Sequence, residues 1–400
     1  MEEKRYLKVF NSQEEYEAQK DDVMEMPHVI FFEDTKSMMY VKETQEEDYS
    51  KEYFTIEALE DGLTIQLSTN TSQYRIDDSE WVSLNANTIT PSINNGQKVS
   101  FKITNPILSR RESIGRFTIN KKCNISGNIM SLLYGDDFEG QIDLSGKDYA
   151  FSHLFGNCTT LQNVKNLILP ATTLAYACYE GMFYDCTSLT TAPSELPATA
   201  LATECYFYMF HGCTSLTTTP KLSATTLARR CYDNMFDGCT SLTTGPALPA
   251  TTLADSCYTY MFYGCTSLET APELPATTLA DSCYSNMFEG CTSLTTTPKL
   301  SATTLAFACY RKMFHGCTSL TTAQEILATT FADNCYSNMF EGCSKLNYIK
   351  MLATDISAYN CLYNWVSGVA SSGTFVKNAA MTSLPSGVNG IPNGWTVENA

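Results

Sequence analysis

Cysteine is the residue type whose number and spacing in this sequence could carry chemistry. The chain has 400 residues and 17 cysteines, and all but Cys123 fall into two registers. The first register is Cys158, Cys186, Cys213, Cys239, Cys265, Cys291, Cys317 and Cys343. The second is Cys178, Cys205, Cys231, Cys257, Cys283, Cys309, Cys335 and Cys361. From Cys213 onward the first register advances by 26 residues at each step, and a fixed period of this size indicates a solenoid.

These cysteines have three possible roles: metal ligands, disulfides, or reduced thiols in a core. The two cysteines of one repeat lie eight residues apart, no second pair has zinc-finger spacing, and the chain has only 4 histidines. Both positions share an apolar face with Leu and Met, where Cys commonly acts as a small buried hydrophobe. We therefore expect reduced core thiols first, lateral disulfides between stacked repeats second, and a metal array last.

Two histidines are the candidates for nucleophilic or acid–base catalysis. His211 and His315 occupy the same slot, directly before a Gly, four repeats apart. An imidazole beside a Cys or Ser side chain is the arrangement of a nucleophilic enzyme. The slot holds Tyr, Asp or Glu in other repeats, so we interpret it as surface and expect both imidazoles to be solvated. With no phosphate loop, distinctive carboxylate pair or metal motif, the sequence predicts neither an enzyme nor a cofactor.

The elements that hold these residues follow from the apolar spacing in "LADSCYTYMFYGC". Residues four apart form two adjacent ridges: Leu253, Cys257, Met261 and Cys265, and Ala254, Tyr258 and Phe262. This spacing predicts a helix with one buried face. Thr252 suits its N-cap, and Gly264 suits a left-handed residue at its end.

The remainder of each unit, such as "TSLTTGPALPA", predicts a short strand. Each repeat is then a strand-turn-helix unit of 26 residues, and the units stack as an α/β solenoid of the leucine-rich-repeat type over 158–368. Residues 126–157 are expected to cap the beginning of the array. Residues 369–400 are expected to cap its end, with Phe375 and Trp395 covering the last apolar layer.

Two further elements are predicted before the array. Residues 1–43 read as a small α+β element with a strand, a helix and a hairpin over 28–41, and 44–52 as a linker. From 53 to 125 the sequence alternates as β-strands do and predicts an Ig-like β-sandwich.

Charge and hydropathy restrict the partners. The formal net charge is −17, with 26 Lys and Arg against 43 Asp and Glu, which argues against nucleic-acid binding. No run of 18 apolar residues occurs, so we expect no membrane insertion. The opening segment lacks the apolar stretch of a secretion signal.

The repeated block "MFxGCTSLT", Leu-Pro after the strand and a second Cys upstream resemble the BspA-like branch of leucine-rich repeats, over about 150–368. That resemblance implies a curved solenoid, no catalytic residues, and a bacterial surface molecule that binds host or matrix ligands. The period of 26 is longer than the usual family unit, and the secretion signal is absent. The segment "FNSQEEYEAQKDDVMEMPHVIFFEDTKSMMYV" is similar to leading segments of structural proteins from phages of gut anaerobes. This likeness implies display on a virion, with residues 1–43 contacting other virion proteins.

Positions that vary between repeats are expected to face outward and to contact a ligand. The candidates are Tyr176, Tyr184, Phe207, Tyr208, His211, Arg229, Arg230, Tyr260, Tyr263, Phe307, Arg311, Lys312 and His315. Aromatic and Arg side chains of this kind anchor interfaces. On the strand side, Thr217, Thr243, Glu269, Thr295 and Thr321 follow one outward slot, and Glu273, Lys299 and Glu325 are expected to stack with alternating charge.

The sequence thus predicts a non-enzymatic recognition or adhesion protein of a cell surface or virion. Its repeated face would bind a cell-surface protein or glycan. The alternative is a structural spacer or decoration protein of a phage particle that binds no ligand of its own.

Overall fold

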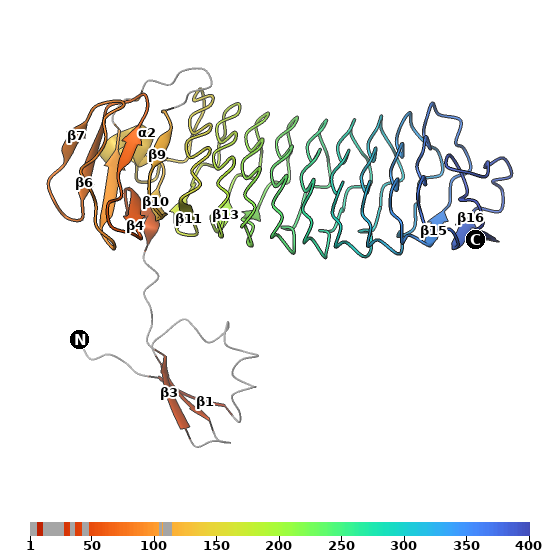
Figure 1. The fold of residues 1–400 in the computed structure, drawn as a ribbon, viewed down its shortest axis with the longest axis horizontal. Helices are drawn as coiled ribbons and strands as arrows, with labels where there is room; N and C mark the ends of the chain where they lie inside the picture. The colour runs from red at the N-terminus through yellow and green to blue at the C-terminus, as the bar shows by residue number, and fades with distance from the viewer. Residues whose placement is uncertain (1–5, 11–27, 33–36, 42–47, 104–105, 107–113) are drawn as a thin grey trace. The chain divides into compact units, whose positions relative to one another are not determined.

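The computed structural model describes residues 6–10, 28–32, 37–41, 48–103, 106 and 114–400. The chain divides into two units, Met1–Asp48 and Tyr49–Ala400. In the first unit β1 (Tyr6–Phe10) pairs in parallel with β2 (His28–Phe32), which pairs antiparallel with β3 (Ser37–Val41) (Figure 1). The predicted hairpin is therefore confirmed, whereas the predicted helix lies outside the described residues.

The second unit begins with a sheet that continues directly into the repeats. Its strand order is β11-β10-β4-β8-β6-β7, with β12 also paired to β10, and a separate pair joins β5 to β9. The bounds are β4 Phe54–Ala58, β5 Ile65–Leu67, β6 Ser72–Ile76, β7 Val82–Leu84, β8 Lys98–Lys102, β9 Phe117–Ile119, β10 Cys123–Asn128, β11 Leu161–Asn163 and β12 Leu167–Ile168.

Strand β10 joins this sheet to the repeats. It pairs antiparallel with β4 on one side and in parallel with β11 and β12 on the other. Phe155 from the first coil packs against Phe54 and Phe117, at ring-centroid distances of 5.7 and 5.6 Å. The predicted Ig-like sandwich over 53–125 is not confirmed, because the larger sheet continues into the repeats through β10 and all these strands share one hydrophobic core with the solenoid.

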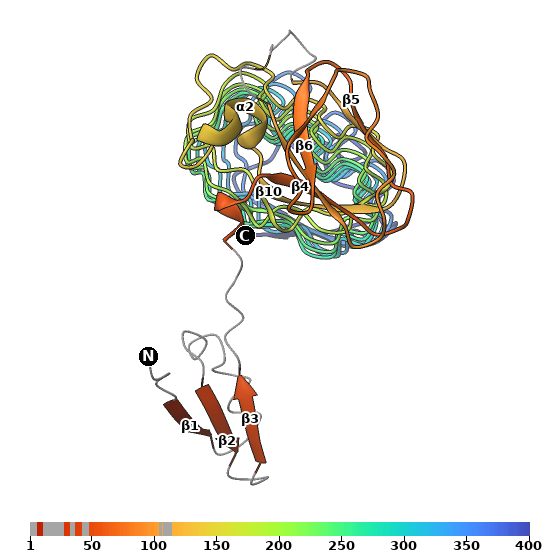
Figure 2. The same ribbon diagram turned by 90° about the vertical axis from the view of Figure 1, so that its left-hand side faces the viewer.

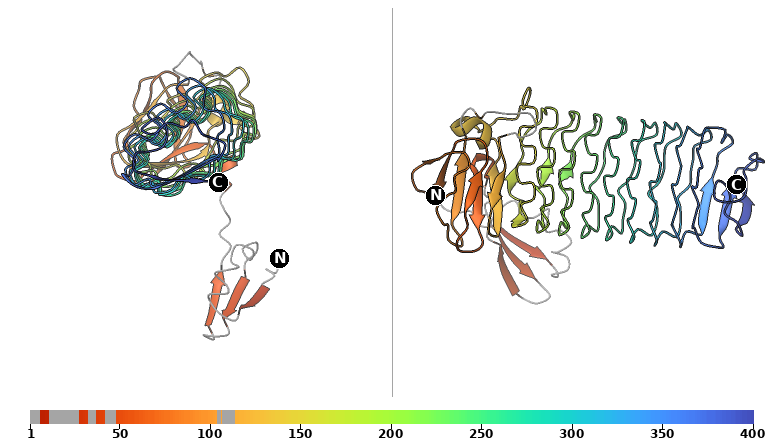
Figure 3. Two further views of the ribbon diagram at one scale, coloured as in Figure 1. Left: turned by 90° about the vertical axis from the view of Figure 1, so that its right-hand side faces the viewer. Right: turned by 45° about the horizontal axis from the view of Figure 1, so that its top comes forward.

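The repeats form a β-solenoid of about eight turns, and the predicted strand-turn-helix unit is wrong in its helix. The described part of the chain holds one short α-helix, α2 (Ser131–Tyr134), and two 3-10 turns, η2 (Tyr49–Lys51) and η3 (Gly135–Asp137). The coils stand side by side in Figure 1 and superimpose around one outline when viewed along the axis in Figure 2. Figure 3 shows the same stack of coils from two further directions.

The segment predicted as a helix is a series of four-residue turns. Ser256, Tyr260 and Gly264 have positive φ angles of 54°, 54° and 65°, which no α-helix contains. The backbone N–H groups alternate: that of Cys257 donates to Ala254 within the coil, and that of Tyr258 donates to Cys283 in the next coil. The left-handed conformation at Gly264 is confirmed, but it recurs every four residues and does not end a helix.

This geometry explains the apolar pattern. A left-handed residue at every fourth position returns the side chains to the interior with a period of 4.0, whereas an α-helix has 3.6 residues per turn. Cys257, Tyr258, Met261 and Phe262 are all buried, as predicted, although for a different backbone reason.

Two columns of aromatic rings run through the interior of the solenoid. One column continues from Phe151 through Tyr179 to Tyr336, and the other from Phe155 through Phe183 to Phe340. Successive rings lie 5.3–5.8 Å apart and 1–13° from parallel. Each buried ring contributes about 1.5–3 kcal/mol through burial, so these columns hold successive coils together.

The strands on the other side of the coils are short. They include β13 (Glu195–Leu196) paired in parallel with β14 (Lys221–Leu222), and single bridges link Thr226, Thr252, Thr278 and Thr304. Near the end, β15 (Tyr348–Met351), β16 (Thr374–Lys377) and β17 (Thr396–Asn399) form a parallel sheet that prolongs the solenoid. Phe375 and Trp395 are buried, as expected of residues that cover the last layer.

Candidate ligand-binding surface

The cysteines lie in the interior and are unsuited to catalysis. All seventeen are buried and none forms a disulfide in the described structure. The thiol of Cys265 donates to the backbone oxygen of Phe236 in the preceding coil at 3.1 Å, and six other members of its register do the same at 3.0–3.2 Å. Burial raises the pKa of the Cys231 and Cys343 thiols to about 12. A protonated thiol that donates a hydrogen bond to a carbonyl is a structural group, because the thiolate is the reactive form.

The variable positions lie on the outer side of the four-residue turns, which we call the turn face. The thirteen predicted ligand-binding residues differ in exposure on this face. Tyr176, Arg229, Tyr263, Phe307 and Arg311 are exposed. Tyr184, Tyr208, His211, Arg230, Tyr260, Lys312 and His315 are half-buried, and Phe207 is buried. These residues remain predicted ligand contacts.

The first group of these residues is already engaged within the protein. His211 stacks on Tyr184 with centroids 4.6 Å apart, and its Nδ1 lies 3.1 Å from Asp237 Oδ2, close but outside hydrogen-bond alignment. Arg230 contacts Glu204 at 3.1 Å and Asp233 at 2.7 Å. These residues brace neighbouring coils and have less freedom to meet a ligand.

Arg230 lies at the centre of a half-buried charge cluster. Its guanidinium carbon lies 4.2 Å from the centroid of the Phe207 ring, and its two carboxylate partners come from its own and the preceding coil. Burial raises the pKa of Asp233 to about 6, and the hydrogen bond from Arg230 offsets only part of that effect. One cation thus serves two carboxylates, which leaves the cluster with an excess negative charge above that pH.

The second group surrounds His315 in a later part of the array. Its Nδ1 lies 3.0 Å from Glu289 and its Nε2 3.9 Å from Glu341, so the imidazole sits between two coils. Lys312 is 4.0 Å from the same Glu289 carboxylate. By contrast, the Arg311 side chain is exposed and has no hydrogen-bond or ion-pair partner among the described residues.

The histidines are not solvated in the way the sequence led us to expect. Both His211 and His315 face carboxylates of neighbouring coils because their slot stacks directly on Asp and Glu. In the described residues no Ser, Thr or Cys side chain is hydrogen-bonded to either imidazole. Nor do three His, Cys, Asp or Glu side chains gather there as a possible metal site.

Two exposed aromatic residues were missed by the sequence reasoning. Tyr359 is 70% exposed and Tyr363 is 48% exposed, compared with 51% for Phe307. Tyr359 and Tyr363 occupy the slots of Phe307 and Arg311 two repeats later, so the internal alignment contained the signal. The predicted set covers the repeats only as far as His315, although the array was predicted to continue to 368.

The strand side carries exposed threonines and short-range charge pairs. Thr217, Thr243, Glu269, Thr295 and Thr321 are all exposed, as predicted. The expected alternation of Glu273, Lys299 and Glu325 produces no ion pair within the described residues; Glu325 instead contacts Lys350 at 2.8 Å. An exposed pair of this kind contributes about 0–1 kcal/mol.

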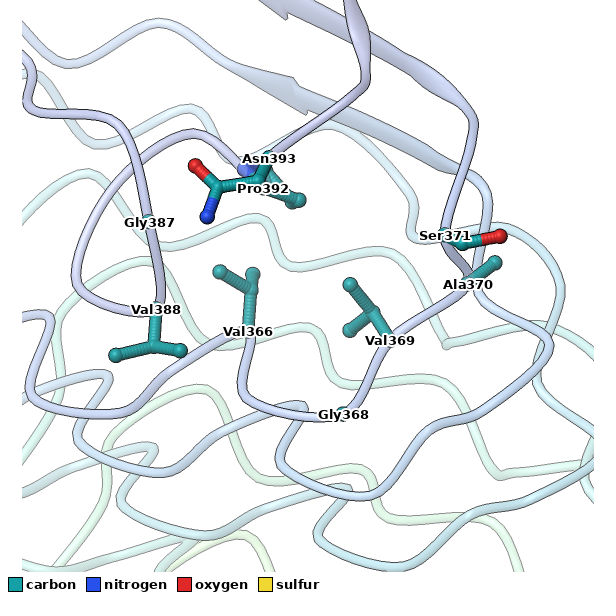
Figure 4. A pocket seen from close by; sticks show the side chains of 9 residues that line it. All are labelled: Val366, Gly368, Val369, Ala370, Ser371, Gly387, Val388, Pro392 and Asn393. Atoms are coloured by element: carbon teal, nitrogen blue, oxygen red, sulfur yellow. The ribbon is translucent and has the colours of Figure 1, made fainter.

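A shallow hollow of about 180 Å³ lies at the end of the solenoid. Val366, Val369 and Val388 project into it, with Ser371 and Asn393 at its edge (Figure 4). Its lining carries no titratable side chain and combines these apolar groups with polar ones.

In the described part of the chain, no helix is long and apolar enough to cross a bilayer. Comparison with curated proteins finds no matching relative. The model of the BspA-type leucine-rich-repeat region matches six copies, over residues 149–258 and 230–366. Repeats of this type are an interaction scaffold and are typical of surface adhesion and recognition proteins. The matched residues span more than half of the sequence, and the chain belongs to the BspA-type leucine-rich-repeat family.

Proposed function

We propose that this protein is a non-enzymatic surface recognition or adhesion protein whose turn face binds a cell-surface protein or glycan. The observation that carries the proposal is the contrast between fixed interior and varied exterior. The interior slots repeat Cys, Tyr, Met and Phe from coil to coil, whereas one outward column reads Tyr184, His211, Asp237, Tyr263, Glu289, His315 and Glu341. A scaffold that keeps its core and varies its exterior is suited to recognition.

The proposed place of action is a cell surface or a virion. The repeat family supports surface association, and the leading segment motivates the virion version, in which residues 1–43 contact other virion proteins. The alternative is a spacer or decoration protein, which the continuous coil-to-coil hydrogen bonding of the array also suits.

Binding of the full chain to intact gut bacterial cells and to mucosal surfaces tests the proposal. We expect the immobilised wild-type protein to capture one of these kinds of cell or mucosal surface specifically. A variant in which Tyr176, Arg229, Tyr263, Phe307 and Arg311 are replaced by Ser is expected to lose that binding, because these side chains are exposed on the turn face.

A matched variant with Thr217, Thr243, Thr295 and Thr321 replaced by Ala changes the opposite side of the same coils and is expected to bind normally. If the wild-type protein captures none of these surfaces, the result favours the alternative of a spacer or decoration protein. Loss of binding only in the Thr variant would assign recognition to the strand side.

A further inference from the structure

The most exposed aromatic side chains of the turn face gather near its C-terminal end. Phe307 and Tyr359 lie two coils apart in one column, and Arg311 and Tyr363 lie two coils apart in the adjacent column. We call these four residues the aromatic platform. Exposed rings that share a surface with an Arg are the usual centre of an interaction site.

The backbone holds the platform in a fixed register. The N–H of Ala308 donates to Asp333 O and that of Asn334 to Tyr359 O, which links the coils of the first column at 3.0 and 2.9 Å. In the second column, the backbone N–H of Lys312 donates to the backbone oxygen of Ser337, and that of Asn338 to the backbone oxygen of Tyr363.

Two carboxylates fix the ring-bearing residues from the coil before each. The backbone N–H groups of Phe307 and Tyr359 donate to Asp281 Oδ1 and Asp333 Oδ1, at 3.0 and 2.8 Å. Both rings therefore start from equivalent, hydrogen-bonded backbone positions, so their spacing follows the solenoid repeat.

That spacing selects the kind of ligand. Paired backbones lie about 4.8 Å apart, and the stacked interior rings of these coils lie 5.5–5.8 Å apart. Two coils therefore span roughly 9.6 Å between backbones and about 11.0–11.6 Å between interior rings. An extended β-strand peptide presents same-side residues about 6.6–6.8 Å apart, which does not match. A polyproline II helix has three residues per turn and about 3.1 Å rise, so it repeats every 9.3 Å or so, which matches the backbone spacing of two coils.

The chemistry of the platform matches the same ligand. A polyproline II chain has no internal hydrogen bonds, so its carbonyl oxygens are open to donors, and its proline rings pack on aromatic faces. The platform offers the rings of Phe307, Tyr359 and Tyr363. It also offers donors in the two phenols and in the Arg311 guanidinium, which has no partner among the described residues.

We infer that Phe307, Arg311, Tyr359 and Tyr363 form a docking surface for a proline-rich segment of a partner protein in polyproline II conformation, running along the solenoid axis. This inference rests on the proposed recognition function and names its partner and its residues. Phe307 and Tyr359 contact successive turns of the ligand, and in the adjacent column Arg311 donates to a ligand carbonyl while Tyr363 packs on a proline ring.

The direct test measures binding of fluorescently labelled decaproline to the full chain by anisotropy. We expect a dissociation constant of roughly 10 µM to 1 mM. The double variant Tyr359→Ser, Tyr363→Ser is expected to weaken binding about tenfold or more, since two ring contacts are lost. Ile89→Ser removes an exposed apolar side chain that lies before the repeats and belongs to no proposed binding surface, and it is expected to change binding less than about twofold.

Three results would overturn the inference: equal binding of decaproline and a Gly-Ser peptide of the same length, equal binding by the wild type and the double variant, or platform-dependent binding of a neutral oligosaccharide in place of decaproline. Circular dichroism melting of each variant confirms its fold, and the exposure of both tyrosines predicts unchanged melting. Cell-surface binding by the same proteins separates the two claims. If the wild type and the double variant adhere equally, recognition stands and the platform fails; if the wild type does not adhere, the proposed function fails.

Discussion

Replacement of Asp233 by Ser should remove a pH-dependent cost in the centre of the array. The Asp233 side chain is 4% exposed. The groups that face it are Arg230 and Asn234 from its own coil and Glu204 and Tyr208 from the preceding coil, with Cys231 and Tyr260 also within electrostatic reach. Later coils hold Thr259, Ser285 and Ser337 in the same slot, so Ser fits the backbone.

The sign of the effect follows from the raised pKa. Burial raises the Asp233 pKa from 3.8 to about 6, so the folded protein binds this proton more tightly than the unfolded chain. Its contribution to stability is fully present below about pH 4 and is lost as the pH rises through 6. A shift of about two units corresponds to roughly 3 kcal/mol.

The measurement is denaturant unfolding of wild type and Asp233→Ser between pH 4 and pH 7.5, with hydrogen exchange of the 228–240 segment to localise the change. Other carboxylates titrate in both proteins, so the difference between the two proteins isolates Asp233. We expect the wild type to lose stability relative to the variant by about 2–3 kcal/mol over this range. The reasoning is refuted if the difference in free energy of unfolding does not change with pH, or if the wild type gains stability relative to the variant as the pH rises. Either result would mean that the ion pair with Arg230 outweighs the effect of burial on the Asp233 pKa.

Three other changes test the architecture. Met287→Asp places an unpaired charge at a fully buried position and should destabilise the fold by more than about 3 kcal/mol in thermal or denaturant unfolding, so an unchanged melt would contradict the burial of Met287. Thiol titration at pH 8 should count close to all seventeen cysteines only after denaturation, because burial keeps them protonated, and rapid reaction of the native protein would contradict the core assignment. Lys312→Asn should raise the free energy of unfolding by about 0.5–1 kcal/mol in denaturant unfolding, because Lys312 has a φ of 54° and Asn tolerates that region better. Asn stands at the same slot in the neighbouring coils, at Asn286 and Asn338. A loss of stability would show that the contact between Lys312 and Glu289 matters more than the backbone strain.

Much of the fold is visible in the repeat itself. The 26-residue period and the apolar slots predict stacked coils, and they correctly place Cys257, Tyr258, Met261 and Phe262 inside. The type of backbone is not visible in the same way, because a period of four is close to that of an α-helix. The difference appears only when non-Gly residues such as Ser256 and Tyr260 are found with positive φ.

The candidate ligand-binding surface was likewise predicted only in part from the sequence. Slot variation alone identifies outward positions, including Phe307 and Arg311, and the same slots of the last coil hold Tyr359 and Tyr363. It does not distinguish the engaged Arg230 from the unpartnered Arg311, since both are Arg in variable slots. Their partners come from neighbouring coils, and these depend on which residues stack.

The sequence by itself determined that near-identical units stack, which side chains fill the interior, and that the cysteines belong there, because periodic burial is written in residue type. Only the tertiary structure decided that the units are chains of turns, that the leading strands share the solenoid's sheet, and which exposed side chains remain available. These outcomes depend on hydrogen bonds and contacts between residues about 26 positions apart. Such partners are set by the register of the stacked coils, which local propensity does not encode.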